Sequence, residues 1–83
     1  MTPPTKAFLA HVATQPPWLI ERELATGETT FGTSQVDTSV LNELRLHGLI
    51  EPKELDRGLL TYELTPTGRR TAREVLRRKQ QAT

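Results

Sequence analysis

The chain has 83 residues, 35% of them hydrophobic, and a formal net charge of +1, which suffices for one domain with a small core. It has no cysteine, which excludes disulfides and thiolate metal sites, and no apolar run approaches the roughly 18 residues of a transmembrane span. We therefore expect one cytoplasmic domain over residues 1–83, without membrane contact and with residues 1–4 and 81–83 disordered.

The first third of the sequence predicts two helices. The first begins after Thr5, whose hydroxyl can cap it, and the prolines at positions 16 and 17 end it. Its buried stripe should consist of Phe8, Leu9 and Val12. The second begins at Pro17 and ends at Gly27. Its buried residues should be Trp18, Leu19, Leu24 and Ala25, and its water-facing residues Glu21, Arg22 and Glu23.

A third helix over residues 34–47 follows a polar loop. Thr33 or Ser34 can cap it, because their side-chain oxygens accept the free backbone N–H groups of a first turn. Gly48 ends it, since glycine readily adopts the positive φ that often follows a helix. The apolar stripe of this helix should consist of Val36, Val40, Leu41 and Leu44.

Residues 50–64 have the pattern of a β-hairpin, with a turn at Asp56-Arg57-Gly58 and alternating residues on the return strand. Pro52 lacks a backbone N–H, so the first of the two strands should be short or at an edge. A last helix begins at Thr65-Pro66 and runs to about residue 80, with Ala72, Val75 and Leu76 facing inward.

Three motifs over residues 41–70 resemble the winged helix-turn-helix domain of bacterial and archaeal transcription regulators: LNELRLHGLIE, the turn DRG, and YELTPTGR. In that family a leucine-rich recognition helix ends in Gly-Leu-Ile, a wing hairpin follows, and Leu-Thr-Pro-x-Gly opens the next helix. The resemblance implies a mainly α fold with a small antiparallel β-hairpin (α+β), made of three helices, a β-wing and a C-terminal helix. It also implies that helix 34–47 enters the major groove of double-stranded DNA beside the 50–64 wing.

The residue types on the outer face of helix 34–47 suit base contacts. Asn and Gln can bond adenine in a bidentate manner, Ser and Thr can contact several bases, and Arg suits guanine or phosphate. Cations on the hairpin and at the start of the last helix suit phosphates. The predicted DNA-binding residues are Ser34, Gln35, Thr38, Ser39, Asn42, Arg45, Lys53, Arg57, Arg69 and Arg70.

Charge and polarity leave other interpretations open. Any solvated helix is polar outside, and residues 1–48 carry a net charge of −2 against +3 for residues 49–83. The arginine-rich last helix could contact DNA, RNA, an acidic protein or only solvent. A winged helix can also act as a protein-interaction adaptor that does not read DNA.

Catalytic and ligand-binding patterns are weak. Residues 27–34 have the spacing of a phosphate-binding loop, but Thr33 stands where that motif needs lysine. Glu43 and His47 are four residues apart, and two ligands do not make a metal site. We therefore expect no enzyme activity, no metal, no cofactor and no small-molecule effector. The preferred hypothesis is a small sequence-specific double-stranded DNA-binding protein, a transcription regulator that acts as a homodimer.

Overall fold

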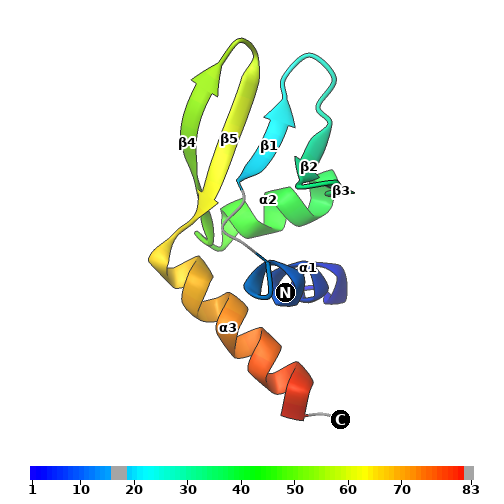
Figure 1. Ribbon diagram of the computed structural model, residues 1–83, viewed down its shortest axis with the longest axis vertical. Coiled ribbons are helices and arrows are strands. Elements are labelled where there is room, and N and C mark those ends of the chain that lie inside the picture. The colour runs from blue at the N-terminus through cyan, green and yellow to red at the C-terminus, as the bar shows by residue number, and fades with distance from the viewer. Residues whose placement is uncertain (16–18, 82–83) are drawn as a thin grey trace.

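A computed structural model describes residues 1–15 and 19–81, which form three helices and one five-stranded antiparallel sheet (Figure 1). The elements in chain order are α1 (Pro3–Ala13), β1 (Ile20–Glu23), β2 (Thr29–Phe31), β3 (Ser34–Gln35), α2 (Thr38–Leu46), β4 (Ile50–Asp56), β5 (Leu59–Leu64) and α3 (Pro66–Gln81). The fold is therefore α+β, as the sequence predicts, but with more strand than one hairpin. None of the helices described is long and apolar enough to cross a membrane.

The sheet joins two hairpins through its central strand. The strand order is β3-β2-β1-β5-β4, so β1 pairs with β2 on one side and with β5 on the other. Ile20 of β1 lies opposite Phe31 of β2 and Tyr62 of β5. Directly opposed residues share a face of the sheet, so these three buried side chains form one apolar row toward the helices.

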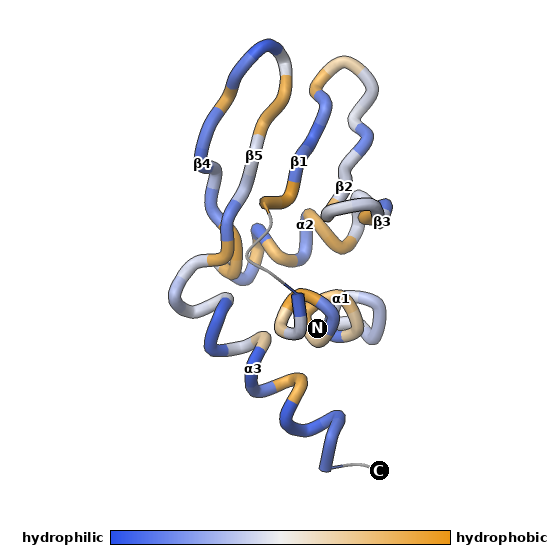
Figure 2. The backbone as a smooth tube through the Cα atoms, in the orientation of Figure 1, coloured by the Kyte–Doolittle hydropathy of each residue, from blue (hydrophilic) through white to orange (hydrophobic). Residues whose placement is uncertain are grey.

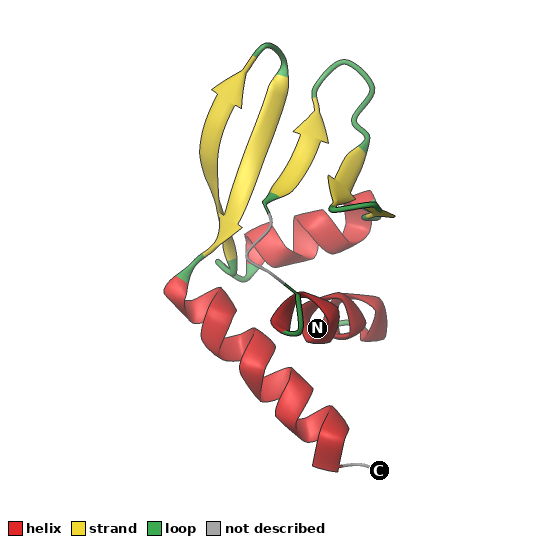
Figure 3. Cartoon of the chain, viewed as in Figure 1, coloured by secondary structure: helices red, strands yellow, loops and turns green. Residues whose placement is uncertain are grey.

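The core lies at one end of the sheet, where α2 crosses the strands and α1 packs against both other helices (Figure 3). Most apolar segments meet there, whereas the turn at the tip of the wing and most of α3 are hydrophilic (Figure 2). Phe8 of α1 meets Phe31 edge-on, with 5.5 Å between ring centroids, which joins α1 to the sheet. The buried cluster consists of Leu9, Val12, Ile20, Phe31, Val36, Val40, Leu41, Leu44, Leu49, Ile50, Tyr62 and Ala72.

The predicted second helix is wrong where the structure describes it. Residues 20–23 form β1 instead, because buried Ile20 and half-buried Arg22 alternate with exposed glutamates at a period of two. Pairing with both β2 and β5 outweighs the local helix preference of this charged segment. Leu24, predicted to be buried, is 50% exposed in the following turn. Pro17 and Trp18, also assigned to this helix, lie outside the described residues.

The boundaries of two further helices differ from the prediction. The third predicted helix begins at Thr38 rather than at residue 34, because Ser34 and Gln35 pair with β2 as strand β3. The first helix begins at Pro3, inside the segment that the sequence analysis assigned to a disordered end, since proline suits a first helical turn.

The C-terminal half follows the prediction closely. Both strands of the 50–64 hairpin are confirmed, as is the last helix, which begins at Pro66. β4 is an edge strand, which agrees with the proline at position 52. Gly48 has a φ of +67°, and Leu49 and Ile50 then enter the core directly. The motif that carries the family resemblance therefore forms a helix, a hairpin and a helix in that order.

Candidate nucleic-acid interface

Four of the predicted DNA-binding residues lie together on the exposed side of α2. Buried Val40, Leu41 and Leu44 hold the opposite side of this helix in the core. Because helical residues three and four apart are neighbours, the apolar stripe leaves one continuous outward face. That face carries the exposed residues Thr38, Ser39, Asn42 and Arg45.

Ser34 and Gln35 are exposed, but they lie on β3 before α2 begins. The side-chain amide of Gln35 donates a hydrogen bond to Glu28 Oε1 at 3.2 Å, which holds it against the β1–β2 loop. The two residues therefore border the N-terminal end of α2 and are not part of its outward face.

Arg45 connects α2 to the wing, which is the β4–β5 hairpin over residues 50–64. Its guanidinium carbon lies 5.9 Å from the ring centroid of Tyr62 on β5, a distance suited to a cation–π contact. Tyr62 is 2% exposed, so the ring is fixed in the core. Arg45 is thus held at the junction of α2 and the sheet.

Arg22 reaches the same face of the sheet from β1, and the sequence analysis missed it. It shares a face with buried Ile20 and lies opposite Thr29 and Leu60. Its Nε atom is buried and has no hydrogen-bond partner among the described residues. A helix over this segment would place Arg22 in water, whereas the alternation of residues 20–23 indicates a strand in which Arg22 points toward the helices.

The strand register separates charge between the two faces of the sheet. Glu21 and Glu54 both lie opposite Thr61, while Glu51 lies opposite Glu63. These positions alternate with the apolar row, so they lie on the other side of the sheet. Glu63, near the end of β5, also lines a hollow with Arg69 and Arg73 of α3. We call this side the acidic face; its carboxylates are Glu21, Glu23, Glu51, Glu54, Asp56 and Glu63. The other side, the helix-facing side, carries Arg22, Leu55, Leu60 and Tyr62.

The tip of the wing is a two-residue turn in which Arg57 and Gly58 have φ values of +52° and +77°. Two successive positive φ values define a type I′ turn, where Asn-Gly is the usual pair. A left-handed conformation costs an ordinary L-residue about 1–2 kcal/mol, so Arg57 occupies an unfavourable position. Its side chain is exposed at the tip.

Lys53 is the extra residue of an irregularity in the register between Pro52 and Glu54. Its Nζ lies 3.8 Å from Glu63 Oε2, so it is paired with a carboxylate of the acidic face. Lys53 therefore does not join the arginines of the helix-facing side.

Arg69 and Arg70 are exposed on α3, which packs on α1. α3 carries six cations and one carboxylate, and the residues buried on it are Gly68 and Ala72. We call its exposed positive side the cationic helix face, comprising Arg69, Arg70, Arg73, Arg77 and Arg78. This face and the outward face of α2 belong to different helices and form two separate surfaces.

Glu43 also lies on α2, but its contacts are structural. Its carboxylate accepts hydrogen bonds from Thr2 N at 2.6 Å, Thr2 Oγ1 at 2.8 Å and Thr5 Oγ1 at 2.9 Å. The hydrogen bond from the Thr2 hydroxyl is the largest cause that lowers the Glu43 pKa from 4.5 to about 2. Glu43 thus supplies a negative charge at the N-terminus of α1, where the helix dipole favours one. In the sequence, Glu43 stands out only through its spacing of four residues from His47.

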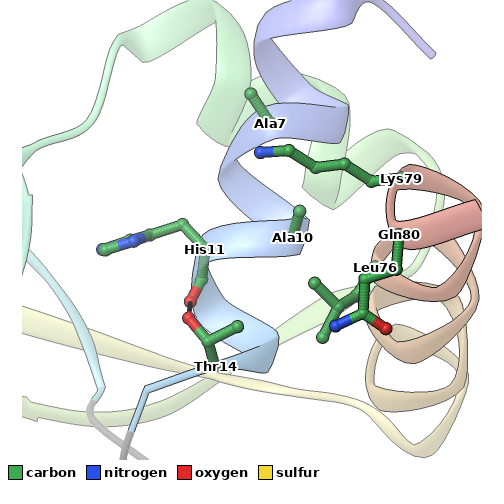
Figure 4. Close-up of a pocket in the computed structure, with 7 residues that line it drawn as sticks. All are labelled: Ala7, Ala10, His11, Thr14, Leu76, Lys79 and Gln80. Atoms are coloured by element: carbon green, nitrogen blue, oxygen red, sulfur yellow. Dashed lines mark hydrogen bonds between the residues drawn. The ribbon is translucent and has the colours of Figure 1, made fainter. Parts of the chain in front are cut away.

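A hollow of about 380 Å³ lies between α1 and α3, lined by Ala7, Ala10, His11, Thr14, Leu76, Lys79 and Gln80 (Figure 4). The imidazole of His11 points away from the α3 side chains and meets the ring of Phe31 edge-on, 6.0 Å between centroids. In the described part of the chain, no three His, Asp or Glu side chains are grouped so that they could hold a metal ion.

Comparison of the chain with protein-family models, with curated proteins and with solved structures found no match. The fold and the placement of charge are therefore the basis for the function proposed below.

Proposed function

We propose that this chain binds double-stranded DNA, with α2 in the major groove and the wing on the adjacent backbone. One observation carries the proposal: every carboxylate on β1, β4 and β5 lies on the acidic face, while Arg22 and Arg45 lie on the helix-facing side. A polyanion approaching α2 therefore meets arginine and polar side chains.

The dimensions of α2 suit this role. A helix with its side chains is about 10–12 Å across and fits a major groove about 12 Å wide, and the nine residues of α2 give it a length of about 14 Å along the groove. Asn42 at the middle of the outward face would contact a base edge, with Ser39 beside it, and Arg45 would contact guanine or a phosphate. Arg57 at the wing tip would reach a phosphate or the minor groove.

Sequence-specific binding suggests a transcription regulator. One nine-residue recognition helix offers few base contacts, so specific binding favours a symmetric dimer on a palindromic site. Lys53 and the α3 arginines are not part of this proposed contact surface.

The experiment is selection of bound duplexes from a random pool, followed by titration of the selected duplex against the Asn42→Ala variant. We expect this variant to lose about 1–3 kcal/mol of discrimination at one base position, because a bidentate contact is removed. Glu28→Ala, in the β1–β2 loop, is the control and should keep the base preference of the unmodified chain. Unchanged affinity and preference in Asn42→Ala would show that α2 does not read bases.

A protein-interaction adaptor is the second candidate, because two large apolar side chains are exposed, one on α2 and one on the wing. Leu46 at the end of α2 is 83% exposed, and Leu55 on the wing is 61% exposed. An apolar partner surface could cover both. Binding to mixed-sequence duplex in rising salt separates the two functions, since DNA affinity falls steeply with salt. Absent binding at low salt would favour the adaptor.

A further inference from the structure

Opposite charges lie at opposite ends of this elongated molecule. The Cα trace extends over 43 × 23 × 21 Å. The sheet and its hairpin turns occupy one end of the long axis, and α3 runs toward the other end (Figure 1). Residues 20–35 and 50–64 carry seven carboxylates and three cations, a net charge of −4, whereas α3 carries a net charge of +5.

The carboxylates of the acidic face are largely uncompensated within the chain. Among the described residues, Glu63 is the member of this face that forms a salt bridge, with Lys53. Glu51 and Glu63 lie directly opposite each other, and like charges in this arrangement destabilise a sheet. A positively charged partner on this face would remove that repulsion.

The cationic helix face is compensated only at its C-terminal end. Glu74 pairs with Arg77 and Arg78, but no salt bridge joins Arg69, Arg70 or Arg73 to a carboxylate within the described part of the chain. Two α3 helices packed together would bring their positive charges into contact, which opposes a dimer through α3 alone. A negatively charged surface is the partner that this helix face suits.

We propose that a second copy of this chain docks antiparallel to the first, with α3 of each copy on the acidic face of the other. Because each charged end of one chain then meets the opposite charge of its partner, both contacts form at once. Such an arrangement has two-fold symmetry and closes at two chains. It leaves α2 and the helix-facing side uncovered, so the dimer forms without DNA and does not depend on the proposed DNA contact.

The absence of cysteine permits a direct test by intermolecular paramagnetic relaxation. A nitroxide attached to the Gln81→Cys variant, at the end of α3, is mixed with ¹⁵N-labelled chain that carries no nitroxide. We expect broadening of backbone amides on the acidic face, centred near Thr61, at an ionic strength of about 0.01 M. The broadening should fade at about 0.15 M, where the Debye length falls from about 30 to about 8 Å. No broadening at low salt, or broadening confined to α1 and α3, would overturn the proposal.

A charge exchange supplies the second measurement. Arg73→Glu and Glu54→Lys should each weaken dimerisation by about three- to tenfold in analytical ultracentrifugation. An equimolar mixture of the two should restore dimerisation, because one contact of the mixed pair is then native and the other has its two charges exchanged. Arg57→Glu, at the tip of the wing, and Glu28→Lys, in the β1–β2 loop, introduce the same charge changes as matched controls. If the control variants weaken dimerisation as much as Arg73→Glu and Glu54→Lys do, net charge rather than these two faces governs association.

Discussion

Arg57 combines an unfavourable backbone conformation with an exposed cation at the tip of the wing, and we propose that it contacts DNA. We expect Arg57→Asn to raise the free energy of unfolding by about 0.5–1 kcal/mol, because asparagine tolerates the left-handed φ of a type I′ turn better than arginine. The same change should weaken binding to every duplex and flatten its salt dependence. Urea unfolding measures the change in stability, and fluorescence anisotropy measures duplex binding. A variant that is more stable and binds duplex DNA as well as the unmodified chain would show that Arg57 does not contact DNA.

Gly68 is fixed by a close approach between α3 and the chain that leads into the wing. A Cβ atom at this position would overlap the carbonyl oxygen of Leu49, which accepts a hydrogen bond from Thr65 N at 3.0 Å. Glycine to alanine normally stabilises a helix, but here we expect Gly68→Ala to destabilise the protein by about 1–3 kcal/mol. Chemical unfolding measures this. The neighbouring Thr67→Ala should have a much smaller effect, and equal effects would contradict the packing explanation.

The carboxylate of Glu43 makes stability depend on pH in a defined window. Its pKa is lowered in the folded chain to about 2, so its contribution is complete above pH 4.5 and is lost as pH falls toward 2. The Glu43→Gln variant should have a lower melting temperature at pH 7 and a shallower decline between pH 4.5 and 2. Glu28→Gln is a matched control on an exposed loop. Parallel melting curves for the wild-type chain and Glu43→Gln across this window would contradict the assignment.

At the scale of elements, the sequence predicted well what local chemistry determines. Gly48, the turn at residues 56–58 and the Thr65-Pro66 helix start each restrict the backbone within a few residues. The hairpin and the last helix therefore follow from the sequence. The outward face of α2 is also predictable, because its apolar stripe fixes which residues face water.

The first hairpin was not predictable in the same way. Residues 20–23 become a strand by pairing with β5, which lies about 40 positions later in the chain, and the sequence alone does not give that register. Because a helix was predicted for residues 20–23, Arg22 was not among the predicted site residues. The separation of charge between the two faces of the sheet was not predictable either, since the face on which a glutamate lies depends on the strand register.

The role of β1 in the proposed interface can be tested through Arg22. We expect Arg22→Gln to weaken binding to all duplexes and to reduce the slope of log affinity against log salt by about 0.9, the value for one phosphate contact. Lys53→Gln makes the same chemical change on the acidic face and should leave both quantities unchanged. A larger loss of DNA affinity in Lys53→Gln than in Arg22→Gln would indicate that DNA binds the acidic face rather than the helix-facing side.

At the scale of the whole molecule, the distribution of charge matters more than its sum. A net charge of +1 hides a sheet region of −4 and a helix of +5. We propose different partners for the two surfaces: DNA for the helix-facing side with α2, and a second copy for the charged ends. Salt weakens both contacts, so each must be measured at a stated ionic strength.

The central claim is that duplex DNA lies against α2 and the helix-facing side of the sheet. The most direct measurement is a titration of ¹⁵N-labelled protein with a duplex selected from a random pool, followed by amide chemical shifts. We expect the largest changes at Ser39, Asn42, Arg45 and Arg57, with few on the acidic face. Changes confined to α3, or no change at low salt, would contradict the claim.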